Sequence, residues 1–354
     1  MASRVHLKTV LFSILLFFTL TGCMKTAHLT VLQPAQFKVP DHIAKIAVID
    51  RSKPSNGWLN VLEGLFTGEA IGQDRQSRQE AVAGLTDALQ RTPRFRVVTT
   101  GLEMAGSKAG DGMPALLPWQ EIERICADYA ADAVVAIESF DSDNSTMTRQ
   151  RSSKKKNKDG TTTTLVDYLA EMRTGVRMGW RFYDPASKMV FDEFVTEDFL
   201  KNEAIADTER KAVANLPSQI SVTRKVAFIV GQEYGMRIAP VYIQVNRQYY
   251  PKAKGFKTQM EQAARLAQDG KWDRAADIWK KIEATAKDNP KAAGRAAYNM
   301  AVMAEVKGNL DIAQEWAEKA WNQYGNKKAR SYIEVIRQRQ SDAKKAEYQM
   351  NKKV

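Results

Sequence analysis

Histidine and cysteine are scarce in this sequence of 354 residues. The three histidines are His6, His28 and His42, so the chain after residue 42 contains none. A Ser-His-Asp triad, a Cys-His pair and most catalytic zinc sites need an imidazole as general base or ligand. The sequence therefore predicts a protein that is not an enzyme, with no catalytic residue, no metal site and no cofactor.

The start of the chain lacks a hydrophobic run long enough to span a bilayer. Residues 9–20 are almost wholly apolar, but a membrane-spanning helix needs roughly 20 such residues. Arg4 and Lys8 precede this run without any acidic residue. A basic segment followed by a short apolar run is typical of a secretory signal peptide, which we place at residues 1–22. An N-terminal anchor helix is the weaker alternative.

Cys23 follows the apolar run directly. The stretch Leu20, Thr21, Gly22 and Cys23 resembles the lipobox of bacterial lipoproteins, in which a peptidase cleaves before the cysteine and its thiol receives a diacylglycerol. The resemblance implies cleavage between Gly22 and Cys23. It also implies that lipid on Cys23 anchors the protein to a membrane, since two or three acyl chains give stable anchoring. An ordinary signal peptide with an incidental cysteine is the alternative. With Cys23 acylated, Cys126 has no partner for an intramolecular disulfide.

The chain has an excess of positive charge. Its net charge of +12 falls to +10 when Arg4 and Lys8 leave with the signal peptide. Such a charge favours anionic partners, namely lipid headgroups, cell-wall polymers and acidic proteins. Nucleic acid is not expected, because an exported protein rarely meets it. Residues 24–28 contain no acidic residue, and by resemblance to lipoprotein sorting signals this implies an outer-membrane lipoprotein of the cell envelope that faces the periplasm.

The first large part of the mature chain is predicted to be an α/β domain at residues 42–250, reached through a tether at residues 23–41. Short runs rich in Ile and Val predict strands, and apolar residues at helical spacing predict helices. The two kinds of element alternate, which favours a mostly parallel sheet. In chain order they are strand 42–50, helix 75–91, strand 94–100, helix 119–129 and strand 132–140.

The pattern then changes to that of an antiparallel meander. Alternation of apolar and polar residues predicts long strands at 162–169, 173–183 and 189–199, with a turn around Pro185. A long helix follows at residues 208–235, which we expect Pro217 to kink or split. The stretch "APVYIQVNRQYY" at 239–250 is interpreted as one more strand that closes the domain.

Residues 256–349 are predicted to be all-helical. Two stretches superpose at a constant offset along the chain, with Ala263 matching Ala301 and Gly270 matching Gly308. The pattern resembles a lengthened tetratricopeptide repeat, which implies stacked helical hairpins. The polar helix at 328–347 fits the cap that a short solenoid requires. A generic helical bundle is the alternative.

Three tryptophans in this helical part are candidates for binding a protein partner, because such repeats usually offer a groove to a peptide or helix. They are Trp272, Trp279 and Trp316, which we also expect to fill the space between hairpins. The array holds only about two repeats and a cap. A purely structural role, in which the repeats pack against the first domain, therefore remains open.

A second candidate surface is the basic stretch "RQRSSKKKNK", which contains no acidic residue. Cations this dense favour contact with anionic headgroups or cell-wall polymer, at up to about 1 kcal/mol per cation near such a surface. A solvated loop between strands is the alternative. The six cations are Arg149, Arg151, Lys154, Lys155, Lys156 and Lys158.

Other motifs carry less weight. The stretch "DSDNS" at 141–145 lacks the Gly and Glu of a calcium loop. Cys126 lies on the apolar face of its predicted helix, which indicates a buried core position. Four carboxylates could in principle pair as acid and base, but any sheet protein scatters such groups. They are Glu138, Asp141, Glu193 and Asp198.

Taken together, the lipobox, "KIAVIDRS", "GMRIAPVYIQVNRQYY" and "A..L...G.WD.AA.IW" resemble an uncharacterised family of Gram-negative lipoproteins with a tetratricopeptide-like C-terminal region. The fold class expected is α+β. The order of elements is also similar to curli-secretion lipoproteins and to lipoproteins that activate cell-wall synthases. We expect an envelope scaffold or adaptor that binds a protein partner, with a subunit of an envelope assembly or secretion complex as the alternative.

Overall fold

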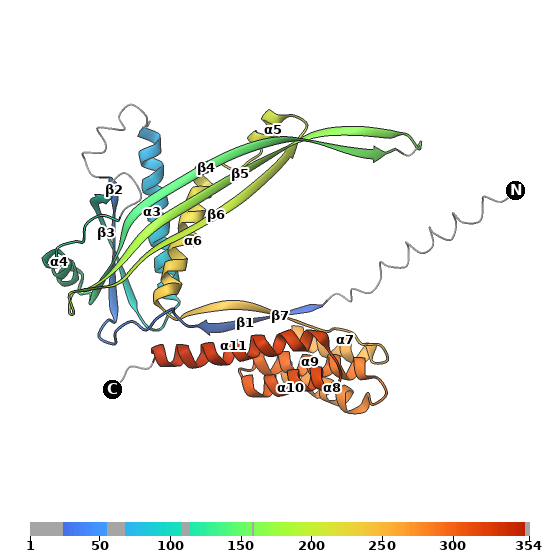
Figure 1. The fold of residues 1–354 in the computed structure, drawn as a ribbon. Coiled ribbons are helices and arrows are strands. Elements are labelled where there is room, and N and C mark those ends of the chain that lie inside the picture. Colours follow the sequence, from blue (N-terminus) through green and yellow to red (C-terminus); the bar gives the residue numbers. More distant parts are fainter. Residues whose placement is uncertain (1–23, 55–67, 108–112, 158, 351–354) are drawn as a thin grey trace. The chain divides into compact units, whose positions relative to one another are not determined.

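The computed structural model describes residues 24–54, 68–107, 113–157 and 159–350 (Figure 1). The chain divides into two compact units. The helical unit contains residues up to 32 and residues 243–345, and the sheet unit contains residues 33–242 and the last residues from 346. The predicted signal peptide, Cys23 and Lys158 lie outside the described residues. Within those residues, no helix is long and apolar enough to cross a membrane.

The sheet unit is built on a five-stranded sheet with the order β3-β2-β4-β5-β6. Strand β2 runs parallel to β3 and β4, whereas β4, β5 and β6 form an antiparallel meander. This arrangement confirms the mixed α+β class and the change from parallel to antiparallel pairing. The strands are β2 (Lys45–Pro54), β3 (Arg96–Ser107), β4 (Ala133–Lys156), β5 (Thr162–Asp184) and β6 (Met189–Ala206).

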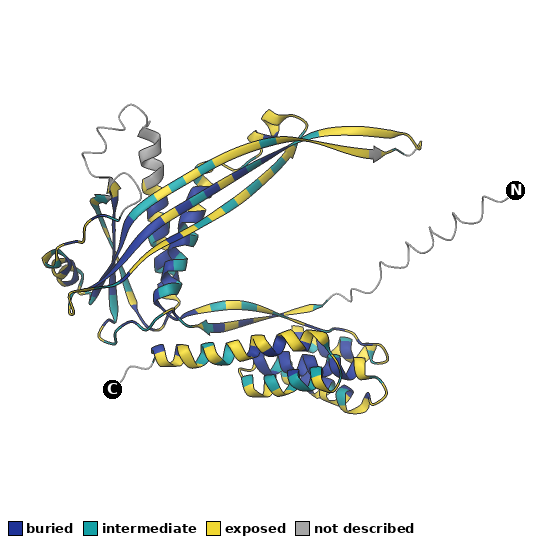
Figure 2. Ribbon diagram, viewed as in Figure 1, coloured by how far each residue is buried: buried dark blue, intermediate teal, exposed yellow. Residues whose placement is uncertain are grey.

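The sequence explains why the two halves of this sheet differ. Ile46 to Ile49 of β2 are all buried, as expected for a strand covered on both faces. In the middle of β5, Met172 and Val176 are buried while Arg173 and Arg177 are exposed. The meander therefore has an inner face, which packs against helices, and an outer face, which carries charged side chains (Figure 2).

Helix α6 packs on the inner face of β5 and β6, and α3 packs on α6 at very close approach. An added Cβ on Gly84 or on Gly231 would lie 2.0 Å from a carbonyl oxygen of the facing helix, so only glycine fits at either position. Tyr234 stacks on Trp180 of β5 with ring centroids 4.7 Å apart. Pro217 separates two of the helices, as predicted. The helices of the sheet unit are α3 (Gly68–Gln90), α4 (Trp119–Tyr129), α5 (Glu209–Ala214) and α6 (Gln219–Ile238).

The strands of the meander are longer than the sequence predicted. Residues 162–184 form one strand instead of two, and β4 includes both 141–145 and most of the basic stretch. Strands β4 and β5 pair along their whole length, from Val134 opposite Tyr183 to Lys156 opposite Thr162. Because each strand supplies the other's backbone hydrogen bonds, the ladder outweighs the poor strand propensity of Asp, Asn and Lys.

Residues 257–350 form helices joined by short turns, as predicted. Gly270 and Gly308, which the repeat matches to each other, adopt φ of +75° and +79° at equivalent turns. Asn289 caps the third helix by accepting a hydrogen bond from the Ala292 N–H, and Pro290 occupies its first turn. Alanines fill the helix contacts. The helices are α7 (Lys257–Gln268), α8 (Trp272–Thr285), α9 (Pro290–Val306), α10 (Leu310–Asn322) and α11 (Lys327–Met350).

A separate two-stranded sheet corrects two predictions. Strand β1 (Lys25–Gln33) pairs with β7 (Val241–Tyr249), and most of both strands belongs to the helical unit. The tether predicted at 23–41 is therefore wrong for β1, whose Ala27, Leu29 and Val31 alternate inward. The stretch 239–250 does contain one more strand, as predicted, but this strand pairs with β1 and not with the five-stranded sheet.

Candidate interaction surfaces

A two-stranded ribbon extends past the rest of the meander. Strand β6 ends its pairing where Ala206 faces Tyr168, but β4 and β5 continue to Lys156 opposite Thr162. Six further residues of β5 at about 3.3 Å each make this extension about 20 Å long. We call residues 149–167, which are this extension and the end of β4 next to it, the basic ribbon (Figure 1). None of its described residues is buried, so it adds nothing to the core.

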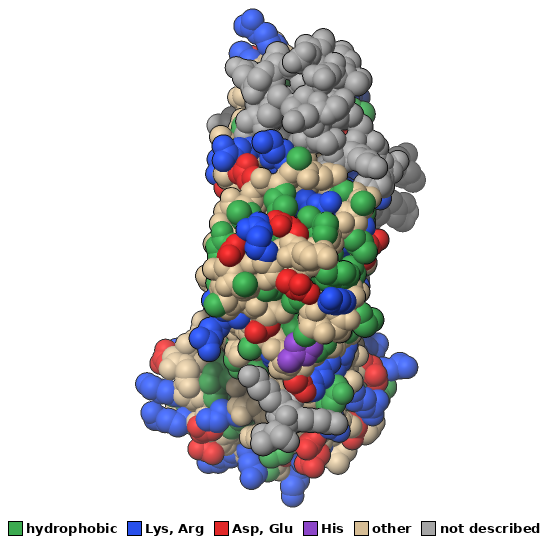
Figure 3. Space-filling view, turned by 90° about the vertical axis from the view of Figure 1, so that its left-hand side faces the viewer, with side chains coloured by type: hydrophobic (Ala, Val, Ile, Leu, Met, Phe, Trp, Pro, Cys, Tyr) green, Lys and Arg blue, Asp and Glu red, His purple; other side chains and the backbone are tan. Residues whose placement is uncertain are grey.

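The structure places the predicted cations on this ribbon. Arg149 and Arg151 are exposed on the outer face, and Lys154 and Lys156 are exposed on the opposite face. They lie on a paired strand, so the alternative of a solvated loop is wrong for these four. The side chain of Lys155 lies outside the described residues, like Lys158. On the face seen in Figure 3, by contrast, basic and acidic side chains are intermingled.

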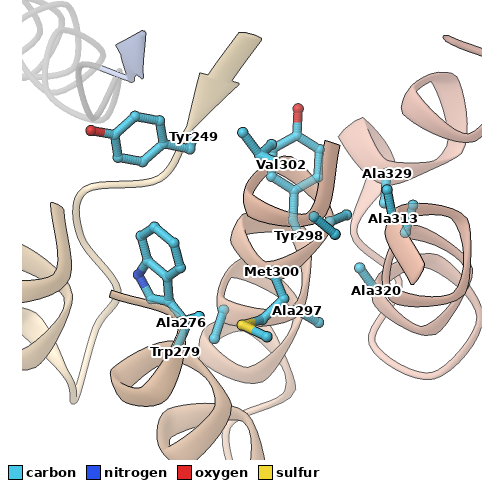
Figure 4. Packing of buried hydrophobic residues seen from close by; sticks show 14 of the residues in the cluster. Tyr249, Ala276, Trp279, Ala297, Tyr298, Met300, Val302, Ala313, Ala320 and Ala329 are labelled. Carbon is cyan, nitrogen blue, oxygen red and sulfur yellow. The ribbon is translucent and has the colours of Figure 1, made fainter. Parts of the chain in front are cut away.

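The three tryptophans proposed for partner binding differ in access. Trp279 is 0% exposed and packs within the core, so the prediction that it binds a partner is wrong. It lies edge-on to Tyr249 at 6.0 Å between ring centroids (Figure 4). Trp272 is half-buried and contacts the same tyrosine at 5.7 Å. Trp316 is half-buried on α10 with the Lys319 ammonium 4.9 Å from its ring centroid, and it remains available to a partner.

Helix α9 holds an extended segment of its own chain, residues 247–254. The buried Asn299 side chain accepts from the Tyr250 N–H at 2.8 Å and donates to the Tyr250 carbonyl at 2.7 Å. Arg295 donates to the Lys252 carbonyl at 2.8 Å, and Asn289 donates to the Lys254 carbonyl at 2.8 Å. These contacts recognise backbone atoms, which is how a helical surface binds a peptide in extended conformation.

A buried ion pair fixes the start of this segment. Arg247 donates two hydrogen bonds to Glu305 at 2.8 and 2.9 Å, and the Tyr332 hydroxyl donates to the same carboxylate at 2.5 Å. The Glu305 side chain is 1% exposed. The face of α9 that could receive a peptide is therefore filled by residues 247–254. The alternation in "VNRQYY" is the sequence signal that could have indicated an inward-facing Arg247 and Tyr249.

The sheet unit contains a buried charged cluster around Glu138, which is 0% exposed. Arg51 donates to Glu138 at 2.8 Å and the Tyr183 hydroxyl donates at 2.5 Å, while Arg181 lies 3.7 Å away and donates to Glu193 at 2.7 Å. Burial raises the pKa of Glu138, and the hydrogen bond from Tyr183 and the charges of both arginines oppose that rise. A carboxylate so enclosed is a structural group, since a substrate has no access to it.

The other candidates from the sequence lie apart from this cluster. Asp141 lies on the outer face of the meander and Asp198 on the inner face, so they do not form an acid–base pair. Cys126 is buried as predicted, and burial, with the charges of Asp132 and Asp184, raises the pKa of its thiol to about 11. In the ranges that the structure describes, no cluster of His, Cys, Asp and Glu could hold a metal ion.

A groove of about 660 Å³ lies between α3 and β3. Arg75 and Glu103 form an ion pair of 2.8 Å in its lining, and Asp50 pairs with the buried Arg78 at 2.9 Å. These pairs tie α3 to the edge of the sheet. The groove was not indicated by any motif, because its lining comes from segments that only the fold brings together.

Comparison with known families shows where the chain belongs. A family model described as a domain of unknown function, DUF8603, matches residues 43–250. The chain is a member of this family. A second model, DUF6340, also described as a domain of unknown function, matches residues 261–351. The two matches meet the expectation of an uncharacterised family, and they divide the chain close to the boundary between the sheet and helical units.

The other comparisons add little. No curated protein matches the DUF8603 chain. It is similar to TolB from Acinetobacter baumannii at 11% identity and a TM-score of 0.20, covering 59% of this chain and 31% of that one. It is also similar to a neuraminyllactose-binding hemagglutinin homolog from Helicobacter pylori at 11% identity and a TM-score of 0.19, covering 58% and 95%. The chain thus spans under a third of the TolB structure. TM-scores of 0.20 and 0.19 do not indicate a shared fold or function.

Proposed function

We propose that this DUF8603 protein is a non-enzymatic adaptor of the bacterial cell envelope. In this proposal a lipid on Cys23 attaches it to the outer membrane, on the periplasmic side. The basic ribbon of the sheet unit contacts an anionic surface, either lipid headgroups or cell-wall polymer, and the helical unit binds a protein partner.

The observation that carries the proposal is the basic ribbon. Its residues bury no apolar surface, and its cations repel one another, so folding gains little from it beyond backbone hydrogen bonds. A paired ribbon nevertheless holds Arg149, Arg151, Lys154 and Lys156 at a fixed spacing in solvent. Fixed cations on both faces favour contact with a surface of negative charge, where each contributes up to about 1 kcal/mol.

For the helical unit, we propose that α7–α10 are tetratricopeptide-like repeats and that α11 is their cap. The equivalent left-handed glycines and the matching alanines one repeat apart support this reading. Because α9 already holds residues 247–254, the partner surface we propose lies on α10. There Trp316 is half-buried, and Ile312, one turn earlier, is 45% exposed.

A second candidate function is a subunit of an envelope assembly or secretion complex. It is favoured by one specific observation, the edge of β4. In the described part of the chain, β2 pairs with β4 only as far as Ile137, which leaves residues 139–156 with a strand neighbour on one side.

Vesicle binding tests the leading proposal. The mature chain with Cys23→Ser, which removes the lipid, is mixed with vesicles of neutral or anionic phospholipid and sedimented. We expect binding to anionic vesicles only, weakened about tenfold or more when Arg149, Arg151, Lys154 and Lys156 are all changed to Gln. A variant with the same loss of charge in the helical unit serves as control: Arg274, Lys280, Lys281 and Lys291, all exposed, changed to Gln.

The control variant shows whether vesicle binding depends on the ribbon itself or only on the net charge of the chain. If the control variant binds like the parent and the ribbon variant does not, the ribbon is the contact surface. Equal weakening of both variants, or no binding by the parent at low salt, would contradict the proposal. Binding should also weaken as salt is raised, because exposed charges are screened.

A further inference from the structure

The meander has two open edges, and their charges differ. Such edges are templates for pairing with another chain unless charges block them. Strand β6 is blocked, because nearly all its charged residues are acidic: Asp192, Glu193, Glu197, Asp198 and Glu203, against Lys201 alone. The edge of β4 is different, since its first half carries Asp141 and Asp143 and its second half carries Arg149 and Arg151.

This division of charge makes the edge of β4 complementary to itself in the antiparallel direction. A two-fold axis at Thr146 puts Asp141 opposite the second copy's Arg151 and Asp143 opposite its Arg149. All four side chains lie on the outer face and are exposed. Opposite charges that face each other directly across two strands stabilise the pair, whereas parallel pairing would oppose like charges.

The centre of the same edge is uncharged. Ser145, Thr146 and Met147 are exposed, and Met147, at 69%, is the most exposed of the large hydrophobic side chains described. In the two-fold arrangement Met147 faces the second copy's Ser145, and the two Met147 side chains lie diagonally across the axis. This arrangement lets the two Met147 side chains bury part of their apolar surface against each other and against Ser145.

The arginines are available for such pairing. Arg149 lies 3.9 Å from Glu171 and Arg151 lies 3.6 Å from Asp167, distances longer than a hydrogen bond. The open length also fits. Pairing about Thr146 places residues 139–153 of one copy opposite residues 139–153 of the second copy. The pairing ends at residue 139 because β2 occupies the edge of β4 up to Ile137. An even register keeps both outer faces on one side of the combined sheet.

We propose that the edge of β4 is a homodimer interface, in which a second copy of this chain adds its β4 antiparallel over residues 139–153 about a two-fold axis at Thr146. The contact is isologous, so it closes at two copies. The inference deepens the second candidate function and does not depend on vesicle binding. Lys154 and Lys156 lie beyond the paired residues and remain free to contact an anionic surface.

Cysteine cross-linking of the full mature chain in detergent tests the register. Directly opposed residues of antiparallel strands have Cα atoms about 4.5–5.5 Å apart, within the range of a disulfide. Thr146→Cys should therefore give a disulfide-linked dimer under mild oxidation. Phe199→Cys on β6, which is 50% exposed, should stay monomeric as the matched control. The native Cys126 is buried and does not compete.

Charge exchange tests the pairing itself. Asp143→Arg in the Thr146→Cys chain should slow cross-linking about tenfold or more, and adding Arg149→Asp should restore it. Cross-linking is measured without vesicles, so failure of the dimer and failure of vesicle binding can be told apart. A folded Thr146→Cys chain that stays monomeric, equal cross-linking through Phe199→Cys, or no rescue by the exchange would overturn the dimer.

Discussion

At the scale of single residues, the buried Asp184 shows how a charged side chain contributes to the stability of the fold. Asp184, whose side chain is 2% exposed, accepts hydrogen bonds from the Ser187 hydroxyl at 2.8 Å and the Ala186 N–H at 3.1 Å, and it contacts His42 at 3.1 Å. Burial acts to raise the pKa of Asp184, but these hydrogen bonds outweigh it and the pKa is lowered. The folded state therefore favours the ionised carboxylate.

The consequence is a defined dependence on pH. A lowered carboxyl pKa stabilises the fold above the unfolded value of about 3.9, and this contribution is lost as the pH falls through the folded pKa. We expect Asp184→Asn to reduce the free energy of unfolding by about 1.5–3 kcal/mol at pH 7 and by much less near pH 3. Urea unfolding at several pH values measures this, with the exposed Asp128→Asn as control. An equal loss at both pH values would contradict the assignment.

The sequence predicted the burial of some candidate residues but not of others. The apolar face of its helix correctly placed Cys126 in the core. Trp279 was predicted both to bind a partner and to fill the space between hairpins. Its burial against Tyr249 agrees only with the second expectation. Glu138 could not be identified as buried, since its partners Arg51, Arg181 and Tyr183 come from three distant segments.

At the scale of elements, the segment held by α9 leads to a prediction. Asn299 satisfies both the donor and the acceptor of Tyr250, and removing it leaves two buried backbone groups without partners. We expect Asn299→Ala to destabilise the helical unit by about 2–4 kcal/mol and to increase amide hydrogen exchange in residues 247–254. Asn322→Ala, at the exposed end of α10, is the control. Unchanged exchange in 247–254 would show that Asn299 does not hold the segment.

The elements themselves were largely predictable, and their ends and partners were not. Helix 119–129 matched α4 because its amphipathic pattern follows a proline and ends in a left-handed Ala130. The pattern in 24–33 was overlooked because these residues were predicted to be a tether after a signal peptide, although Ala27, Leu29 and Val31 alternate as in any strand. The long β4 was missed because the charges of Asp141 to Lys156 suggest loops, and only the ladder with β5 shows otherwise.

At the scale of the whole molecule, the proposal requires that Cys23 carries a lipid. Mass spectrometry of the native protein should find an N-terminal Cys23 with its acyl groups. Cys23→Ser should lower the share of the protein in the membrane fraction, because it removes the acyl chains that would hold the protein there. An intact leader or an unmodified thiol on native material would contradict the proposal. Cys126→Ser, at the buried cysteine, should leave the distribution unchanged.

The division into two parts was predicted from the change in composition near residue 255, and the compact helical unit of the structure also includes the strand before that point. The cause is β1, which precedes the five-stranded sheet in the chain, while its partner β7 follows that sheet. Long-range pairing of this kind leaves no local signal. The scarcity of histidine favours a binding protein, which stays a prediction. The charge pattern along the edge of β4 could be recognised only once the strand order was known.

The early start of β1 has a consequence for how such a protein would work at a membrane. Strand β1 begins at Lys25, and Met24 already packs against the hydrophobic core of the helical unit. At about 3.8 Å per residue, at most about 8 Å of chain separates the Cα of an acylated Cys23 from folded structure. If Cys23 is acylated, the helical unit would therefore lie close to the lipid headgroups. The distance at which it could bind a partner would then depend on the size of the folded protein and not on a flexible linker.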